Sequence, residues 1–251
     1  MIDVRHLSHS FGPHPALQDC SFHLSRGEVL FLTGPSGAGK STLLRLLFAD
    51  LPLQRGEAVV AGFPLSKIRA AQVPLLRRQV SMVFQDFKIL PLRTVYDNIV
   101  LPLQVRGMDK THADRRVLAA ARAVELENKL ESSCVDISGG EQQRVAVARA
   151  LVVNPRILLA DEPTGNMDPE LALQIMDIFK KFQNYGTTLI IATHSPELIL
   201  RNPRARILRL DQGMITQANW PGAILNKFSS AVPLAAYGGG ARHDSTEERD
   251  G

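Results

Sequence analysis

The sequence contains few of the residues that would mark a secreted, disulfide-bonded or membrane-spanning protein. Its 251 residues include only two cysteines, Cys20 and Cys134, which are far apart and outside any C-x-x-C spacing. We therefore expect neither a structural disulfide nor a cysteine metal site. No apolar run approaches the roughly 18 residues of a membrane-spanning helix, and the first ten residues lack an apolar signal core. These absences predict a cytoplasmic protein.

Blocks of like charge are also missing. The formal net charge is +4, and the lysines and arginines are scattered along the chain. This distribution argues against a dedicated nucleic-acid surface, so we predict no nucleic-acid partner, while a basic patch facing anionic lipid stays open. Apolar residues, in contrast, make up 45% of the chain, which is enough for the core of one domain with an embellishment.

Short apolar runs bounded by turn residues or charges recur along the chain: VLFLT (29–33), VSMVF (80–84), ILLA (157–160) and LIIAT (189–193). Runs this continuous suit strands covered on both faces, hence a mainly parallel sheet between helices. Residues 2–11 alternate loosely and predict antiparallel strands at an edge. Between Met108 and Leu130 the apolar spacing is helical, with Thr111 and Asp114 resembling a capping box. The sequence therefore predicts an α/β fold with an inserted helical segment.

A glycine-rich stretch, GPSGAGKST, directly follows the first run and precedes a predicted helix. This is the phosphate-binding P-loop pattern in its required context. Its backbone N–H groups curl around phosphate oxygens, Lys40 reaches the β- and γ-phosphates, and Ser41 offers its hydroxyl to Mg²⁺. A plain glycine-rich turn would leave the lysine and the hydroxyl unexplained. The residues expected to bind nucleotide here are Gly34, Pro35, Ser36, Gly37, Ala38, Gly39, Lys40, Ser41 and Thr42.

Polar residues follow three of the other predicted strands, where open α/β sheets bind ligands. Asp161 is expected to hold the metal, and Glu162 to polarise the attacking water. Gln85 can reach metal or water through a neutral amide, and His194 can donate a hydrogen bond to the γ-phosphate. Each residue alone has a structural explanation, such as a strand end or a helix cap. The P-loop favours the catalytic interpretation.

The stretch ISGGEQQRVAVARAL (137–151) predicts an amphipathic helix that begins with two glycines. Ser138 can cap this helix, but capping gives no reason for a second glycine. We predict that Gly139 and Gly140 allow close approach of an anion to open backbone N–H groups at the helix start.

These motifs, in this order, resemble the nucleotide-binding subunits of ABC ATPases over residues 1–216. The resemblance implies an ABC ATPase fold, ATP and Mg²⁺ as cofactors, and hydrolysis of ATP to ADP and phosphate. It also implies a head-to-tail homodimer in which each signature stretch faces the ATP bound to the other subunit. The further nucleotide-binding residues that it implies are Phe11 as the adenine-stacking ring, Ser138, Gly139, Gly140, Glu141 and Asp168. It assigns catalysis to Glu162, His194 and Gln85, and the metal to Ser41, Gln85 and Asp161.

Within this family the chain is most similar to the cell-division group, FtsE, especially in VFQDFKILPLRTVYDNIVLPLQVRG (83–107). Phe11, Ile137 and Met167 depart from common residues of the family, but conservatively. The resemblance implies an FtsX-like integral membrane partner, whose cytoplasmic helix would dock on residues 85–107, and a peripheral location on the inner membrane. For Phe87, Ile89, Leu90 and Leu92 a simple core role is the alternative.

The predicted organisation is one ABC ATPase domain, 1–216, with its core in 1–85 and 156–216 and a helical subdomain in 86–155. Residues 217–251 form an extension that we expect to be largely disordered, because it loses periodicity and ends glycine-rich and charged.

Three functions compete on these grounds. The favoured one is a division ATPase that acts as a mechanical switch on its membrane partner and, indirectly, on an extracytoplasmic peptidoglycan hydrolase or its activator. The second is the motor of an ABC exporter or lipoprotein-release transporter, which would share every catalytic residue. The third, a soluble ABC protein acting on nucleic acid or ribosomes, is disfavoured by the single cassette and the scattered charge.

Overall fold

A six-stranded sheet forms the centre of the computed structural model, which describes residues 1–165, 167–221 and 223–224. The strands lie in the order β10-β9-β3-β8-β7-β6. All pair in parallel except β10, which runs antiparallel to β9. Their bounds are β3 (Val29–Thr33), β6 (Val80–Val83), β7 (Ile157–Asp161), β8 (Thr188–Ala192), β9 (Arg206–Asp211) and β10 (Met214–Ala218). The four apolar runs are thus confirmed as neighbouring parallel strands.

Both faces of this sheet are buried, which explains why its strands are apolar without interruption. In β3, Phe31 packs into one hydrophobic cluster, while Leu30 and Leu32 pack into the other. In β8, Ile191 and Ile190 divide between the same two clusters. Side chains alternate between the faces of a strand, so each run supplies two cores at once.

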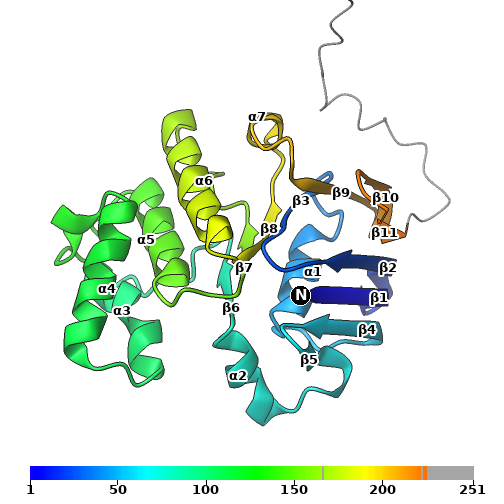
Figure 1. Ribbon diagram of the computed structural model, residues 1–251, viewed down its shortest axis with the longest axis horizontal. Coiled ribbons are helices and arrows are strands. Elements are labelled where there is room, and N and C mark those ends of the chain that lie inside the picture. The colour runs from blue at the N-terminus through cyan, green and yellow to red at the C-terminus, as the bar shows by residue number, and fades with distance from the viewer. Residues whose placement is uncertain (166, 222, 225–251) are drawn as a thin grey trace, which may run out of the picture.

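The antiparallel strands predicted from residues 2–11 are present, and they form a second sheet (Figure 1). Its strands lie in the order β11-β2-β1-β4-β5. Their bounds are β1 (Ile2–Phe11), β2 (His14–Leu24), β4 (Arg55–Val60), β5 (Phe63–Pro64) and β11 (Ala223–Ile224). Helix α1 (Lys40–Leu47) contacts β2 as well as β7 and β8, so it lies between the two sheets.

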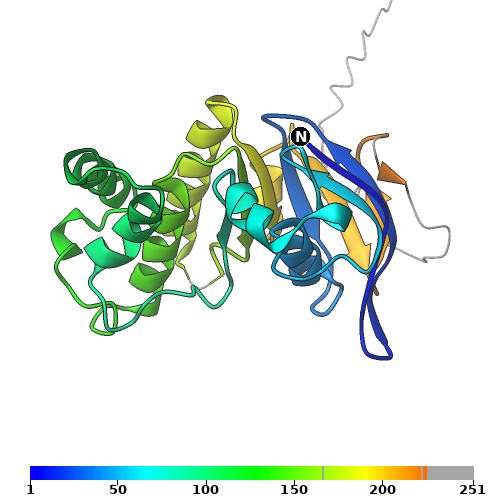
Figure 2. The ribbon, with the colours of Figure 1, turned by 90° about the horizontal axis from the view of Figure 1, so that it is seen from below.

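A group of helices lies at the end of the molecule opposite the antiparallel sheet (Figures 1 and 2). Three of them, α3, α4 and α5, follow β6 and precede β7 in the chain and contact one another. The longer helices are α3 (Val95–Val105), α4 (Lys110–Ala123), α5 (Gly139–Leu151) and α6 (Pro169–Asn184). The short ones are α2 (Val73–Arg77), α7 (Pro196–Leu200) and 3-10 turns at Leu65–Lys67, Ala70–Gln72 and Glu127–Lys129.

Two local predictions need correction. Helix α4 begins at Lys110, and its N-cap is Asp109, whose carboxylate accepts the His112 N–H. The capping box expected of Thr111 is therefore wrong, because the helix has already begun there and Asp114 binds Tyr96 and Lys110 instead.

The predicted extension also begins too early. The strand β10 continues through Ala218, and Ala223–Ile224 pairs with Phe22 and Ser21 of β2, so ordered structure passes residue 217. The rest of the predicted extension, 225–251, lies outside the described residues. Among the residues that are described, no helix is long and apolar enough to cross a membrane.

Candidate functional site

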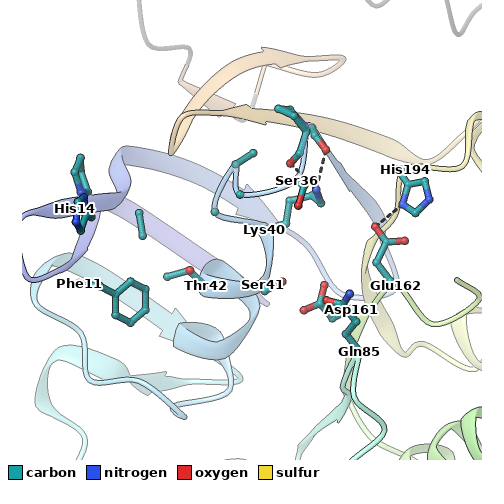
Figure 3. A pocket seen from close by; sticks show the side chains of 17 residues that line it. Phe11, His14, Ser36, Lys40, Ser41, Thr42, Gln85, Asp161, Glu162 and His194 are labelled. Atoms are coloured by element: carbon teal, nitrogen blue, oxygen red, sulfur yellow. Dashed lines mark hydrogen bonds and ion pairs between the residues drawn. The ribbon is translucent and has the colours of Figure 1, made fainter.

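A cavity of about 580 Å³ opens at the carboxyl ends of the central parallel strands (Figure 3). The P-loop follows β3, Gln85 follows β6, Asp161 ends β7, and His194 lies just beyond β8. Parallel strands end at the same edge of the sheet, so residues far apart in sequence meet there. The lining residues are Phe11, His14, Pro15, Ala16, Gly34, Pro35, Ser36, Gly37, Ala38, Gly39, Lys40, Ser41, Thr42, Gln85, Asp161, Glu162 and His194.

The P-loop packs against its own chain at two glycines. A Cβ added at Gly34 would lie 2.0 Å from the carbonyl oxygen of Leu210, and at Gly39 it would lie 2.4 Å from that of Ala16. Both glycines have a positive φ that only glycine adopts without strain. Gly39 is also the N-cap of α1 and makes no side-chain capping bond. The start of α1 therefore points uncapped backbone N–H groups at the cavity.

Lys40 holds its positive charge inside this loop. Its Nζ donates to the carbonyl oxygens of Gly34, at 2.7 Å, and Pro35, at 2.9 Å. A concentrated positive charge beside uncapped helical N–H groups suits the phosphate chain of a nucleotide.

Oxygen ligands for a hard cation meet beside the P-loop. Asp161 is only 5% exposed, and burial raises the pKa of its carboxyl above the ordinary value, while a hydrogen bond with Ser41 opposes the rise. A buried carboxylate next to a hydroxyl and the amide oxygen of Gln85 fits Mg²⁺, which prefers oxygen ligands and is usually shared with substrate phosphates. No group of three or more His, Cys, Asp or Glu side chains in the described residues could hold a metal by itself.

Glu162 is held at its N–H, its carbonyl oxygen and its side chain. The N–H donates to Ala192 at 3.0 Å, the carbonyl accepts the side chain of Gln143 at 3.1 Å, and the carboxylate pairs with His194 Nδ1 at 2.9 Å. The backbone of Glu162 has φ +48°, a left-handed conformation that is costly for a residue with a side chain. These three contacts hold the Glu162 backbone and its carboxylate in place at the cavity wall.

An exposed aromatic ring closes the far side of the cavity from His194 (Figure 3). Phe11 is 48% exposed, and its ring lies at 77° to that of His9 with 4.9 Å between ring centroids. This exposure leaves ring surface available for stacking. The residues His14, Pro15 and Ala16 also line the cavity, and sequence reasoning missed them. The tight turn after Phe11, which brings the start of β2 alongside, was the signal that could have found them.

Five of the predicted site residues lie outside this cavity: Ser138, Gly139, Gly140, Glu141 and Asp168. Asp168 caps α6, and its carboxylate accepts the Leu171 N–H at 3.0 Å. At the start of α5, Ser138 and Glu141 form a complete capping box, with bonds of 2.8 and 3.3 Å. The capping role predicted for Ser138 is therefore confirmed, and Glu141 completes the box.

Glycine at position 139 has no explanation within the described chain. A Cβ added there would meet no described atom within 4 Å. Even with the capping box, the geometry of a helix leaves the N–H groups of Gly139 and Gly140 without intrahelical acceptors.

Comparisons with known proteins agree with this geometry. The model of the family described as ABC transporter matches residues 17–165. The chain is 44% identical over 214 residues to the cell division ATP-binding protein FtsE of Escherichia coli strain K12, covering 85% of this chain and 96% of that protein. It is 41% identical over 219 residues to FtsE of Mycobacterium tuberculosis strain H37Rv, covering 86% and 95% respectively.

Among solved structures, the dimeric bacterial ABC transporter cassette MJ0796 is similar with a TM-score of 0.83 and 30% identity, covering 87% of this chain and 98% of that one. A dimer of the same cassette in a post-hydrolysis state, bound to ADP and Pi, gives a TM-score of 0.82 over the same shares.

Proposed function

This chain belongs to the ABC transporter family of ATP-binding cassettes and is an ATPase; from that premise we propose that it is the ATP-hydrolysing subunit of an FtsE–FtsX-like complex in bacterial cell division. It lies as a homodimer on the cytoplasmic face of the inner membrane, bound to an FtsX-like integral membrane protein. Closure of the dimer on ATP pulls on that partner, which activates a peptidoglycan hydrolase or its activator outside the membrane. The observation that carries the proposal is the convergence of P-loop, Gln85, Asp161, Glu162 and His194 on one cavity.

The residues of the cavity divide the work of hydrolysis. Lys40 and the N–H groups at the start of α1 bind the phosphates, and Phe11 stacks on the adenine. Ser41, Asp161 and Gln85 hold Mg²⁺, which neutralises developing charge on the phosphate oxygens when it is bound.

The reacting water is handled by the pair at the cavity wall. Glu162 accepts a proton from the attacking water, and His194, joined to that carboxylate, hydrogen-bonds the γ-phosphate. Their 2.9 Å contact holds the base and the phosphate-binding imidazole in one arrangement before substrate arrives.

Glu162→Gln tests the catalytic part of this proposal. The amide keeps the size of the side chain but cannot act as a base, so ATP binding should persist while hydrolysis falls by roughly 100-fold or more. An ATP-bound dimer should accumulate on size-exclusion chromatography. Hydrolysis at the wild-type rate would show that Glu162 is not the base.

An ordered apolar segment after Gln85 supports the membrane partner. Phe87 and Lys88 adopt left-handed backbone conformations, and their carbonyls accept the guanidinium of Arg149 at 2.6 and 2.7 Å. The backbone N–H of Leu90 donates to Asn98 at 2.7 Å, and its carbonyl accepts from Asn98 at 3.0 Å. Four hydrogen bonds thus fix a segment that would otherwise be an exposed loop.

This segment presents apolar side chains to solvent. Leu92 is 85% exposed, and Val135, which is bonded through its N–H to Pro91, is 57% exposed. Phe87 and Ile89 pack partly on the core instead. Exposed leucine and valine on a fixed backbone suit the apolar face of a partner's amphipathic helix.

Affinity copurification from detergent-solubilised membranes tests the partner. The wild-type chain should retain an FtsX-like membrane protein, and Leu92→Asp should reduce its recovery about tenfold, as for an interface anchor. Tyr185→Asp is the control, because Tyr185 is equally exposed, at 87%, but outside the segment. Recovery of an exporter subunit or of nucleic acid, or full recovery of the partner with Leu92→Asp, would contradict this part of the proposal.

A further inference from the structure

A buried amide on α5 contacts the backbone of Glu162. Gln143 lies five residues after Ser138 and is only 2% exposed. Its Nε2 donates to the carbonyl oxygen of Glu162 at 3.1 Å. The helix that begins with the glycine pair is therefore bonded directly to the residue that we assign as the base of its own chain.

This amide is poorly explained by stability alone. Its Oε1 is buried and has no hydrogen-bond partner among the described residues. The same helix places apolar side chains in the core just beyond it, at Val145, Ala146 and Val147. A buried amide with half of its bonding capacity unmet is a cost to folding, and an apolar side chain of the same size would remove that cost.

The bond from Gln143 acts on a residue with a strained backbone conformation. Glu162 has φ +48°, and its carbonyl otherwise accepts only the Gly165 N–H, at 3.2 Å, among the described residues. A left-handed residue persists only when its surroundings hold it there. The direction of the Glu162 side chain follows from that backbone conformation, so the Gln143 amide helps to set where the carboxylate points.

We infer that Gln143 is a positioning residue for ATP hydrolysis. It orients Glu162 through the carbonyl oxygen of that residue, and it couples the start of α5 to the end of β7, directly before Glu162. The inference rests on the proposed role of Glu162. If the start of α5 contacts the nucleotide of the neighbouring subunit, a shift of α5 reaches the carboxylate of its own subunit through one side chain. Each site would then respond to occupancy of the other.

Gln143→Met tests this inference, because methionine has a similar length but donates no hydrogen bond. The kcat for ATP should fall about tenfold while KM stays within about twofold, as for loss of an interaction used only in the chemical step. Gln183→Met is the matched control. Gln183 also donates its amide to a backbone carbonyl, that of Gly27 at 3.0 Å, and it does not line the cavity, so kcat should not change.

A double-mutant cycle separates positioning from general damage. In the Glu162→Gln background there is no base left to orient, so Gln143→Met should change the residual rate by less than about twofold. A tenfold loss in both backgrounds would overturn the inference, because Gln143 would then act independently of Glu162. An unchanged kcat in folded Gln143→Met protein would overturn it too.

A different result would contradict the proposed function itself. Normal hydrolysis by Glu162→Gln would remove the role of Glu162, whatever Gln143→Met does, and the inference would fall with it. If Gln143→Met does not fold, Gln143→Asn takes its place with the same expected results, since it keeps an amide that is one methylene too short to reach the carbonyl.

Discussion

Two glycine-rich turns begin helices in this molecule, and they differ in what requires the glycines. Before α1, a Cβ added at Gly34 or Gly39 would lie within 2.4 Å of a backbone carbonyl oxygen, and the helix has no side-chain cap. At the start of α5, Gly139 meets no described atom, and a complete capping box is present. The first turn is demanded by the fold of its own chain, whereas the second is not.

This difference indicates where each turn meets its ligand. The uncapped start of α1 lines the cavity, so the chain supplies that anion site by itself. The start of α5 lies outside the cavity, and its glycine keeps a surface clear that nothing in the described chain occupies. Because nothing in the described chain requires glycine at position 139, we infer that the glycine serves a contact with another molecule. In the proposed homodimer that molecule is the other subunit.

Gly34→Ala should break the first turn and give the largest effect. The added Cβ would lie 2.0 Å from the backbone oxygen of Leu210, at a φ of +134°. We expect a loss of about 3 kcal/mol or more in the free energy of unfolding, together with loss of ATP binding. The reason is that neither the P-loop nor the backbone at Leu210 can move away without disrupting the structure around it. Chemical denaturation and nucleotide titration measure both. A stable variant that binds ATP normally would contradict the tight packing.

Gly139→Ala should sharpen the comparison by separating folding from activity. Because Gly139 has open space around it, the free energy of unfolding should change by less than about 1 kcal/mol, and alanine is the better helix former. Binding of ATP to the monomer should persist. Hydrolysis should fall by roughly tenfold if the methyl group obstructs close approach of the other subunit's phosphate. Unimpaired hydrolysis would show that the glycine serves no close approach.

The sequence alone predicts the parts of this protein that depend on local pattern. The parallel strands follow from continuous apolar runs, and the P-loop follows from spacing and context. The α4 start was misassigned because Asp109 and Thr111 are both good caps two residues apart. The cap at Ser138 also follows from the sequence, and the S-x-x-E spacing of Ser138 and Glu141 is the pattern of a full capping box.

Contacts across the chain were beyond such reasoning. The bond from Gln143 to Glu162 joins a helix to a strand end 19 residues later, and no periodicity encodes it. His14 enters the cavity only because β2 turns back beside the P-loop. The assembled site therefore needed the structure, although most of its residues were identifiable in advance.

The central claim is that the start of α5 serves the ATP site of the other subunit, and mixed dimers test it most directly. Lys40→Ala disables a subunit's own P-loop, and Ser138→Arg disables the helix start that it lends to its neighbour. Each homodimer should be inactive. Mixing the two variants should restore hydrolysis, because one of the two sites then carries neither defect.

The converse mixture completes the measurement. The double variant paired with wild type should be inactive, because each site then carries one defect. If the helix start served its own subunit, this mixture would keep one intact site and the mixture of single variants would stay inactive. Hydrolysis restored by mixing the single variants is the result that the account predicts, and hydrolysis found only with the double variant and wild type would contradict it.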